Sequence, residues 1–472
     1  MKTLWHKFWQ EERFRIRALL LLAFLIRFLS ILPLGNGVSY PLRDQNTYYL
    51  LGRTIVDDGF LGVPREARGP YVETRDLVQA RPEGFYPAFH DSMSAVWDAQ
   101  GRLYGIVEWG KPSSFWEPFY PVVCSGLFVL FGDNFFFWRL VHVVLATLLI
   151  FFVYDLGKRV FKDERIGTWA ALYAGFYPYY IFYSRILVPE ALLNLLLVMG
   201  AWAYFRLVEK PGYGWALLMG LTFGVFSLTR SFLMAFFPVM LVLIVLFVKD
   251  RRRWKLAGMA ALGLILTLSP WIYRNYRLHE QLVLLSTRSG YNIWMRNNPY
   301  FIEDEYAAMG VKFSPEYLDK LNYREYIFGY PAFTPEQGEL ERNRILSQEG
   351  MKFLGANPGF LFKLCWIRFK WTIGWKGIGL GPLQNLISLL SYGPILLGFA
   401  ASLIWGWGRL GATLPLWGLV GYFVLFYSLT HEGLRYRMPV DALMMILAVS
   451  SALTVYDRII KKRIPKTGPS HV

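Results

Sequence analysis

The chain has 472 residues, 54% of them hydrophobic and 18% aromatic, and its formal net charge is +16. Apolar runs that approach the ~20 residues needed to cross a bilayer recur along it, which a soluble core of this size would not require. Lysines and arginines gather in short loops between these runs, as expected for cytoplasmic loops. This placement argues against nucleic-acid binding and predicts a polytopic membrane protein.

The first apolar run, Ile16 to Leu34, follows a basic N-terminal segment, which predicts an uncleaved first span with the N-terminus inside. A polar segment from Gly35 to about Pro118 then lies outside the membrane. The apolar stretch Pro118–Phe131 is too short to span comfortably, so we expect an interfacial or re-entrant helix there. The next spans are predicted at Phe135–Leu156, Ile166–Phe182, Pro189–Val208, Trp215–Leu228, Phe232–Val248 and Leu256–Trp271.

A second outer segment runs from Tyr273 to about Pro382. Within it, Phe360–Trp375 is apolar but interrupted by basic residues, which predicts an amphipathic helix on the outer surface. Three further spans return the chain to a basic cytoplasmic tail: Leu386–Trp405, Leu414–Leu429 and Val440–Val455. Cys124 and Cys365 both fall on the outer side, and a large membrane bundle does not need a disulfide between them.

The predicted fold is therefore an all-α integral membrane bundle of about ten transmembrane helices, with two large outer loop elaborations and both termini in the cytoplasm. The expected regions are residues 1–34 (cytoplasmic N-terminus and first helix), 35–134 (first outer loop with interfacial helices), 135–271 (transmembrane bundle), 272–383 (second outer segment), 384–456 (C-terminal helices) and 457–472 (cytoplasmic tail).

Three acidic residues lie where outer segments meet spans, all on the same predicted side: Asp44, Glu117 and Glu190. Singly, each has a structural explanation, such as a helix cap for Asp44, a favourable charge at a helix start for Glu190, or an ion pair for Glu117. Together, three carboxylates on one membrane face predict a site that acts as a general base or holds a cation.

Basic residues form a second set on the same side. Arg230 is at a turn between two spans, Arg274 follows Pro270-Trp271, and Arg435 and Arg437 fall in Arg435-Tyr436-Arg437-Met438-Pro439. Arginine binds phosphate through bidentate hydrogen bonds. Snorkelling or lipid head-group binding is the alternative for any single arginine. Positive charge on the outer side runs against the orientation rule, which favours a specific role.

These features resemble a known family, the polyprenyl-phosphate-sugar-dependent glycosyltransferases of the C superfamily (GT-C), which include lipid A aminoarabinose transferases and protein O-mannosyltransferases. The elements that carry the resemblance are Asp44 with Tyr48, Glu117-Pro118-Phe119-Tyr120-Pro121, Arg139, Ser184-Arg185 with Glu190, Pro270-Trp271-Ile272-Tyr273-Arg274-Asn275, Gly290-Tyr291-Asn292, Asn297-Asn298-Pro299 and Arg435-Tyr436-Arg437-Met438-Pro439. Each element is weak alone, whereas their order and spacing together are fairly specific.

The resemblance implies a GT-C-type bundle that transfers a sugar from an undecaprenyl-phosphate-like donor to an acceptor on the periplasmic face of the inner membrane, with inversion. Asp44 matches the catalytic base, assisted by Glu117 and Glu190. The expected donor-phosphate ligands are Arg274, Arg435 and Arg437, and the expected substrate-binding residues are Tyr48, Tyr291 and Asn292.

The resemblance leaves several points open. It fixes no cofactor, and a divalent cation could be held by the three acids. The acceptor could be a lipid, a glycan or a protein. The alternative functions are a transporter or flippase of lipid-linked sugars, which would use charges along a path and internal repeats, and an O-antigen ligase or polymerase with a pyrophosphate donor.

Overall fold

A computed structural model describes residues 7–37, 43–63, 96–97, 103–104, 107–108, 110–297, 333–334, 336–377, 380–405, 410–431 and 433–460. This part of the chain is almost entirely helical, apart from the antiparallel pair β1 (Val96–Trp97) and β2 (Leu103–Tyr104). The predicted all-α membrane fold is confirmed. Parts of both predicted outer segments, and the tail after Ile460, lie outside the described residues.

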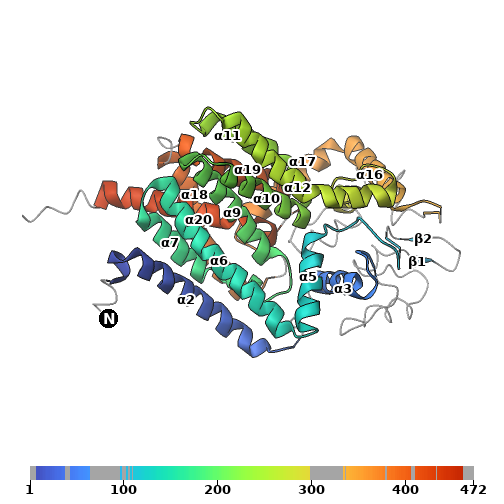
Figure 1. Ribbon diagram of the computed structural model, residues 1–472, viewed down its shortest axis with the longest axis horizontal. Coiled ribbons are helices and arrows are strands. Elements are labelled where there is room, and N and C mark those ends of the chain that lie inside the picture. The colour runs from blue at the N-terminus through green and yellow to red at the C-terminus, as the bar shows by residue number, and fades with distance from the viewer. Residues whose placement is uncertain are drawn as a thin grey trace, which may run out of the picture.

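Figure 1 shows the helices coloured in chain order, from α2 in blue to α20 in red. They are α2 (Glu12–Ile31), η1 (Leu32–Leu34), α3 (Arg43–Asp57), α5 (Phe119–Phe131), α6 (Phe135–Phe161), α7 (Glu164–Phe176), α8 (Pro178–Tyr183), α9 (Glu190–Glu209), α10 (Tyr213–Thr229), η3 (Ser231–Phe236), α11 (Phe237–Phe247), α12 (Arg253–His279), α13 (Ser289–Asn297), α16 (Glu339–Ala356), α17 (Pro358–Ile373), α18 (Pro382–Trp405), α19 (Leu410–Thr430), α20 (Leu434–Val455) and η5 (Tyr456–Ile460).

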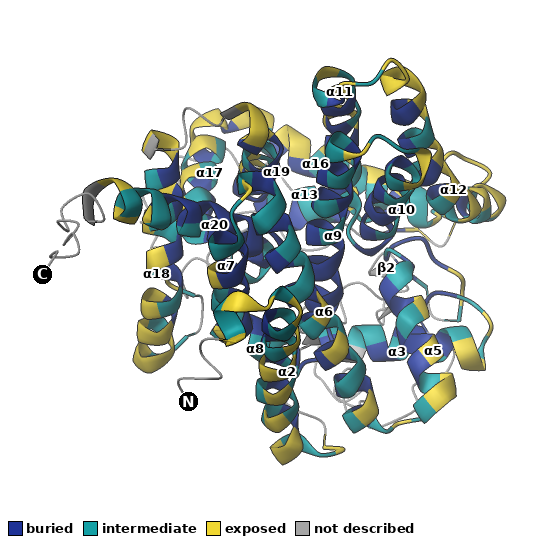
Figure 2. Ribbon diagram, turned by 60° about the vertical axis from the view of Figure 1, so that its left-hand side comes forward, coloured by how far each residue is buried: buried dark blue, intermediate teal, exposed yellow. Residues whose placement is uncertain are grey.

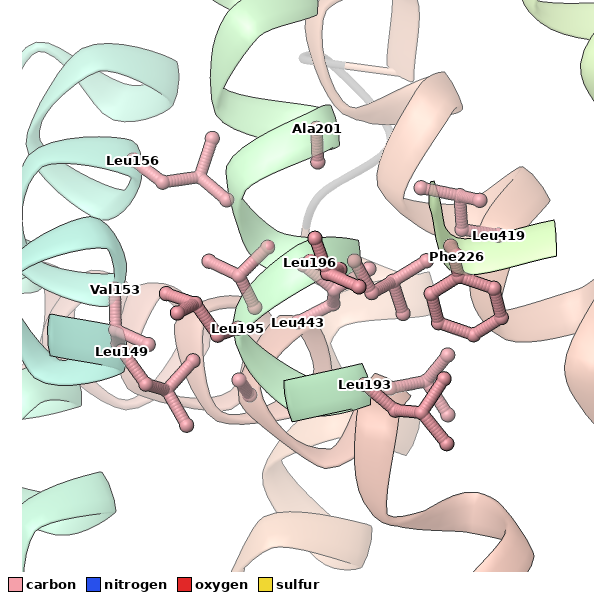
Figure 3. Close-up of a cluster of buried hydrophobic side chains, with 14 of the residues drawn as sticks. Leu149, Val153, Leu156, Leu193, Leu195, Leu196, Ala201, Phe226, Leu419 and Leu443 are labelled. Carbon is pink, nitrogen blue, oxygen red and sulfur yellow. The ribbon is translucent and has the colours of Figure 1, made fainter. Parts of the chain in front are cut away.

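The core of the bundle forms around α9, whose apolar side chains point in all directions. A helix that is hydrophobic all round is buried on every side, and α9 packs against α6, α10 and α20. Figure 3 shows Leu193, Leu195 and Leu196 of α9 between Leu149 and Val153 on one side and Phe226 and Leu443 on the other. The outer helices carry the exposed apolar residues (Figure 2), as expected where lipid replaces water.

Seven helices are long and apolar enough to cross a membrane, by length and composition, among the residues that the structure describes. Three shorter apolar helices accompany them: Phe119–Phe131, Tyr213–Thr229 and Ser231–Phe247. The chain is therefore a multi-pass membrane protein, as the sequence predicts. The total of ten spans and the direction of each stay predictions.

Several helix boundaries differ from the predicted ones. The predicted span Ile166–Phe182 is broken into α7 and α8 at Tyr177, because Pro178 disfavours helical geometry in the residue before it. Helix α12 continues to His279, eight residues past the predicted end at Trp271. Helix α20 begins at Leu434 instead of Val440, so Arg435 and Arg437 lie on a helix.

The helix predicted at Phe360–Trp375 is present as α17, but it packs along α19 and fully buries one of its basic residues. Arg368 donates to the backbone oxygens of Arg296 and Leu429 and to Asn297 Oδ1. These three oxygens accept hydrogen bonds from the buried guanidinium, so this helix is not simply a surface element.

Helices α3 and α5 pack against each other beside the bundle (Figure 1). Gly52 allows the close approach, because a Cβ atom there would lie 2.6 Å from the Cβ of Cys124. Cys124 and Cys365 are both free thiols in this structure. The α3–α5 pair matters for function because α3 carries Asp44.

Candidate active site

A cavity of about 1130 Å³ lies where α3, η3, α13, α16, α19 and α20 meet. Its charged and polar lining includes Asp44, Tyr48, Glu117, Arg230, Ser231, Arg288, Asn292, Arg296, His431 and Arg435. Its apolar lining includes Leu282, Leu284, Met351, Leu354, Leu361, Phe426 and Leu429. A cavity of this size, lined by many charged and polar groups beside an apolar wall, has the character of a binding site.

Arg435 joins two of the predicted acids. Its Nε donates to Glu190 Oε1 and its Nη1 donates to Asp44 Oδ2. Glu190, at the start of α9, is only 2% exposed, and Arg230 Nη2 lies 3.7 Å from its Oε1. Asp44, in the first turn of α3, keeps 42% of its side-chain exposure because it faces the cavity. Residues far apart in the sequence thus form one carboxylate–guanidinium cluster.

The cluster keeps Asp44 ionised. Burial by itself would raise the pKa of Asp44, but attraction to Arg435 and the hydrogen bond from it outweigh burial. Arg230 and Arg288 act in the same direction, so the pKa lies well below its usual value. Tyr48, one turn later on α3, has its pKa raised to about 12, first by burial. It therefore faces the cavity as a neutral phenol.

Two atoms of this cluster have unused hydrogen-bonding capacity. Arg435 Nη2 and Glu190 Oε2 are buried and have no hydrogen-bond partner among the residues that the structure describes. One is a donor and the other an acceptor. A hydroxyl group, which both accepts and donates, is the kind of group that satisfies such a pair.

Glu117 lines the same cavity without joining this cluster. Its Oε1 accepts a hydrogen bond from Ser231 Oγ at 2.8 Å and a longer one from Ser286 Oγ at 3.5 Å. The structure thus brings all three predicted acids to one region, with Asp44 and Glu190 bridged by Arg435 and Glu117 held by hydroxyl groups.

Buried polar contacts hold α3 in position. Gln45 Oε1 accepts from the backbone N–H of Leu187, just before Glu190. Tyr48 packs edge-on against Tyr120, whose hydroxyl lies 3.0 Å from His142 Nε2. His142 Nδ1 faces the carbonyl of Ile186 at 3.0 Å. A carbonyl only accepts, so Nδ1 carries the proton and Nε2 accepts from Tyr120.

A second basic group lines another part of the cavity. Arg288 directly precedes α13, Arg296 is in its last turn, and His431 follows α19. Arg288 packs over the ring of Phe115, and no carboxylate among the described residues forms an ion pair with it. Burial, followed by the charges of Arg296 and Arg288, holds the pKa of His431 well below its usual value, so this histidine is neutral.

Two of the arginines predicted to bind phosphate do not line the cavity. Arg274 donates to the backbone oxygen of Ser113 and to Ser114 Oγ, both at 2.9 Å. Arg437 is buried in the bundle, where it donates to Asp441 Oδ1 at 2.8 Å and packs over the ring of Tyr392. Both arginines have protein partners that account for their charge or their donors.

The three predicted substrate-binding residues also separate. Tyr48 and Asn292 line the cavity. Tyr291 is fully buried beside Phe115, on the other side of α13, and does not line it. Consecutive residues of a helix point about 100° apart, so Tyr291 and Asn292 cannot both face one narrow site.

Sequence reasoning missed Arg288, Arg296 and His431. A signal was present, since Arg288 directly precedes the quoted Gly290-Tyr291-Asn292 element and His431 is close to Arg435. Their grouping depends on packing between α13 and α19, which no local pattern reveals.

A metal centre made by the three acids does not fit this arrangement. No group of three or more His, Cys, Asp or Glu side chains suited to a metal ion occurs in the described part of the chain. The guanidinium of Arg435 already lies between Asp44 and Glu190 and supplies positive charge there.

Comparisons with known proteins bear on this fold and site. The sequence profile of the family described as dolichyl-phosphate-mannose-protein mannosyltransferase matches residues 111–273, from just before Glu117 to α12. The archaeal oligosaccharyltransferase AglB from Archaeoglobus fulgidus, solved with an inhibitory peptide and a dolichol-phosphate, aligns over 96% of this chain with a TM-score of 0.53 and 12% identity. At this identity, the likeness to the archaeal enzyme shows a shared fold.

This chain covers 52% of the length of that archaeal enzyme. ArnT from Cupriavidus metallidurans, solved bound to undecaprenyl phosphate, aligns over 94% of this chain and 79% of its own, at 13% identity and a TM-score of 0.41. No curated protein sequence matches. The resemblance to the archaeal enzyme extends to the fold, while the family, the donor and the acceptor are matters for proposal.

Proposed function

We propose that this protein is a GT-C glycosyltransferase, which transfers a sugar from a polyprenyl-phosphate donor to an acceptor hydroxyl with inversion at the anomeric carbon. The observation that carries the proposal is the ionised Asp44 carboxylate facing a large cavity that also contains arginines and an apolar wall. A general base, cationic partners for a phosphate, and apolar surface for a lipid chain are the elements that this reaction needs.

In the proposed step, the acceptor hydroxyl donates a hydrogen bond to Asp44. Its oxygen attacks the anomeric carbon while the bond from that carbon to the phosphate oxygen breaks. The electron pair of this bond leaves with the polyprenyl phosphate, and the hydroxyl proton passes to Asp44. The cavity arginines stabilise the charge that grows on the phosphate.

Arg435 has a positioning role in this mechanism. It fixes the Asp44 carboxylate relative to Glu190, and its Nη2 together with Glu190 Oε2 suits a hydroxyl of the bound sugar. A group held in place before the reaction lowers the barrier because it does not have to be ordered in the transition state. No step is routed through a metal ion.

The apolar lining suits the isoprenoid chain of the donor. Leu282 and Met351, which are exposed, line the cavity and lead from its polar region to the protein surface. We place the cavity on the periplasmic side of the inner membrane and both termini in the cytoplasm, as the basic loops indicate. The acceptor could be a lipid, a glycan or a protein, and the sugar a hexose or a pentose.

Mass spectrometry of envelope lipids and glycans tests the proposal, in cells with and without the gene. We expect loss of one sugar from one envelope component, and restoration by the wild-type gene. The lipid extract of the deletion strain, in which unused donor accumulates, then serves as donor for the purified protein.

Asp44→Asn preserves size and removes basicity, so turnover should fall by ~10²–10⁴ while the protein still folds. Asp57→Asn is the matched control, because Asp57 is on the same helix, pairs with Arg53 and lies outside the cavity. It should retain activity within about twofold, as expected for a surface ion pair. Near-normal turnover of Asp44→Asn would refute the base assignment, and an unchanged envelope in the deletion strain would favour transport of a lipid-linked sugar or no role in the envelope.

A further inference from the structure

We infer that the donor phosphate binds at Arg288 and Arg296, which line the same cavity as Asp44, and that Arg435 is a partner of the carboxylates and not the phosphate ligand. This inference rests on the proposed function and assigns the leaving-group end of the site. Two independent observations support it, one from the geometry of displacement and one from the apolar lining.

The first observation is the direct contact between Arg435 and Asp44. In an inverting displacement, the attacking oxygen and the leaving oxygen lie on opposite sides of the anomeric carbon. The base contacts the attacking oxygen, so the base and the phosphate end up roughly 6 Å or more apart. Donors of one guanidinium belong to a single small planar group, so an anion on Arg435 Nη2 would lie beside Asp44, on the wrong side of the sugar.

Arg288 meets this requirement. It lines the same cavity as Asp44 but makes no ion pair with it, and it acts on Asp44 only through longer-range attraction. Asp44 and Glu190 are already engaged by Arg435 and Arg230, whereas Arg288 has no carboxylate partner among the described side chains. A bound phosphate would supply the missing negative charge.

The second observation is the position of the apolar lining. Four consecutive lining residues, Leu282 to Leu285, lead directly to Arg288 along the chain. Met351 and Leu354 lie on α16, which packs against α13, the helix that carries Arg296. A polyprenyl phosphate joins its anionic group directly to its apolar chain. The phosphate therefore belongs where arginine and apolar lining are adjacent, which is the α13 end.

His431 fits the same assignment. It is neutral and lines the cavity near both arginines. Its ring can donate one hydrogen bond to a phosphate oxygen without needing a counter-charge of its own.

The test measures the preference for a phosphate over an alcohol on the same lipid. Undecaprenyl phosphate and undecaprenol share the apolar chain, so their ratio of affinities isolates the phosphate contribution. Native mass spectrometry of the purified full-length chain in nanodiscs, with both lipids present, gives this ratio without any turnover.

We expect the wild type to prefer undecaprenyl phosphate by on the order of tenfold to a hundredfold, as for one or two hydrogen bonds to a charged group. Arg288→Gln should remove most of this preference, and Arg288→Lys should restore part of it, since lysine keeps the charge without the planar fork. Arg435→Lys should keep the preference within about twofold of wild type. Arg277→Gln removes an exposed charge on α12 outside the cavity and serves as the control.

The opposite pattern, in which Arg435→Lys abolishes the preference and Arg288→Gln preserves it, would overturn the inference. Equal binding of the two lipids by the wild type would also overturn it. Failure of this inference and failure of the proposed function give different results. If the protein transfers no sugar, the Arg288→Gln variant could still lose the preference for phosphate. If the protein is an Asp44-dependent transferase but the inference is wrong, the Arg288→Gln variant keeps that preference.

Discussion

Arg435 and Arg437 lie two residues apart on α20, in the same short sequence element, and have opposite surroundings. Arg435 faces the cavity, where it binds Asp44 from α3 and Glu190 from α9. Arg437 faces the bundle, where it pairs with Asp441 one turn later and donates to the carbonyls of Thr372 and Gly374.

Helix geometry explains this difference. Residues two positions apart in an α-helix are separated by about 200° around the helix axis. Arg435 and Arg437 therefore point in nearly opposite directions. The cavity-facing arginine contacts carboxylates on two other helices, whereas the bundle-facing arginine pairs with a carboxylate on its own helix and packs over an aromatic ring. Of two arginines in one short sequence element, Arg435 therefore belongs to the proposed active site, and Arg437 stabilises the packing of the bundle.

The largest expected effect concerns the bundle-facing pair. Arg437→Met leaves the fully buried Asp441 carboxylate without its cationic partner, which should cost about 3–5 kcal/mol of stability. Thermal unfolding in detergent, followed by size-exclusion chromatography, should detect a marked loss of folded protein. The double variant Arg437→Met/Asp441→Leu removes both charges and should recover much of the loss, since an apolar pair can replace a buried ion pair. An Arg437→Met protein that is fully stable but inactive would instead place Arg437 in the reaction.

The second expected effect concerns the cavity-facing arginine. Arg435→Gln removes the main cause that lowers the pKa of Asp44, while the burial that raises it remains. A general base works when ionised, so the acidic limb of the pH–rate profile should move from below the usual carboxyl pKa of ~4 to higher pH. Turnover at neutral pH should also fall by about 10², because the carboxylate loses its positioning partner.

The measurement for this prediction is the ratio of the turnover at about pH 5 to the turnover at about pH 8. A carboxyl group whose pKa is raised titrates within this range. This ratio should drop in Arg435→Gln and remain at the wild-type value in Tyr177→Phe, which removes only a hydroxyl donor to Asp441 in the bundle. An unchanged profile in Arg435→Gln would contradict the role of Asp44 as the titrating base.

The smallest expected effect concerns the helix that carries Asp44. Gly52→Ala introduces a Cβ atom 2.6 Å from Cys124 Cβ and 3.0 Å from the backbone nitrogen of Ser125, so α3 must move away from α5. Overpacking of this kind costs about 1–3 kcal/mol. Thermal stability should fall, and turnover should fall with it because Asp44 shifts relative to Arg435. Gly126→Ala on α5, where a Cβ atom meets nothing within 4 Å, is the control and should leave both unchanged.

Much of the membrane architecture could be predicted from local patterns. The positions of α6, α9, α10, α18 and α19 follow from the lengths of apolar runs, and the helix that starts near Asp44 follows from its sequence. The predictions for Ile166–Phe182 and for the ends of α12 and α20 differ from the structure. In each case a proline or a polar helical extension changed where the helix ends, and hydropathy does not report such extensions.

The sequence by itself determined that this is a multi-pass membrane protein and that Asp44, Glu117 and Glu190 occur at the ends of apolar segments. Those properties depend on runs of neighbouring residues. Only the tertiary structure decided that Arg435 binds Asp44 and Glu190, that Arg274 and Arg437 are engaged elsewhere, and that Arg288 and His431 line the cavity. These partners are separated by up to 391 positions, and the packing of α3, α9, α13 and α20 brings them together. An ion pair depends on distance in space, which a linear pattern does not contain.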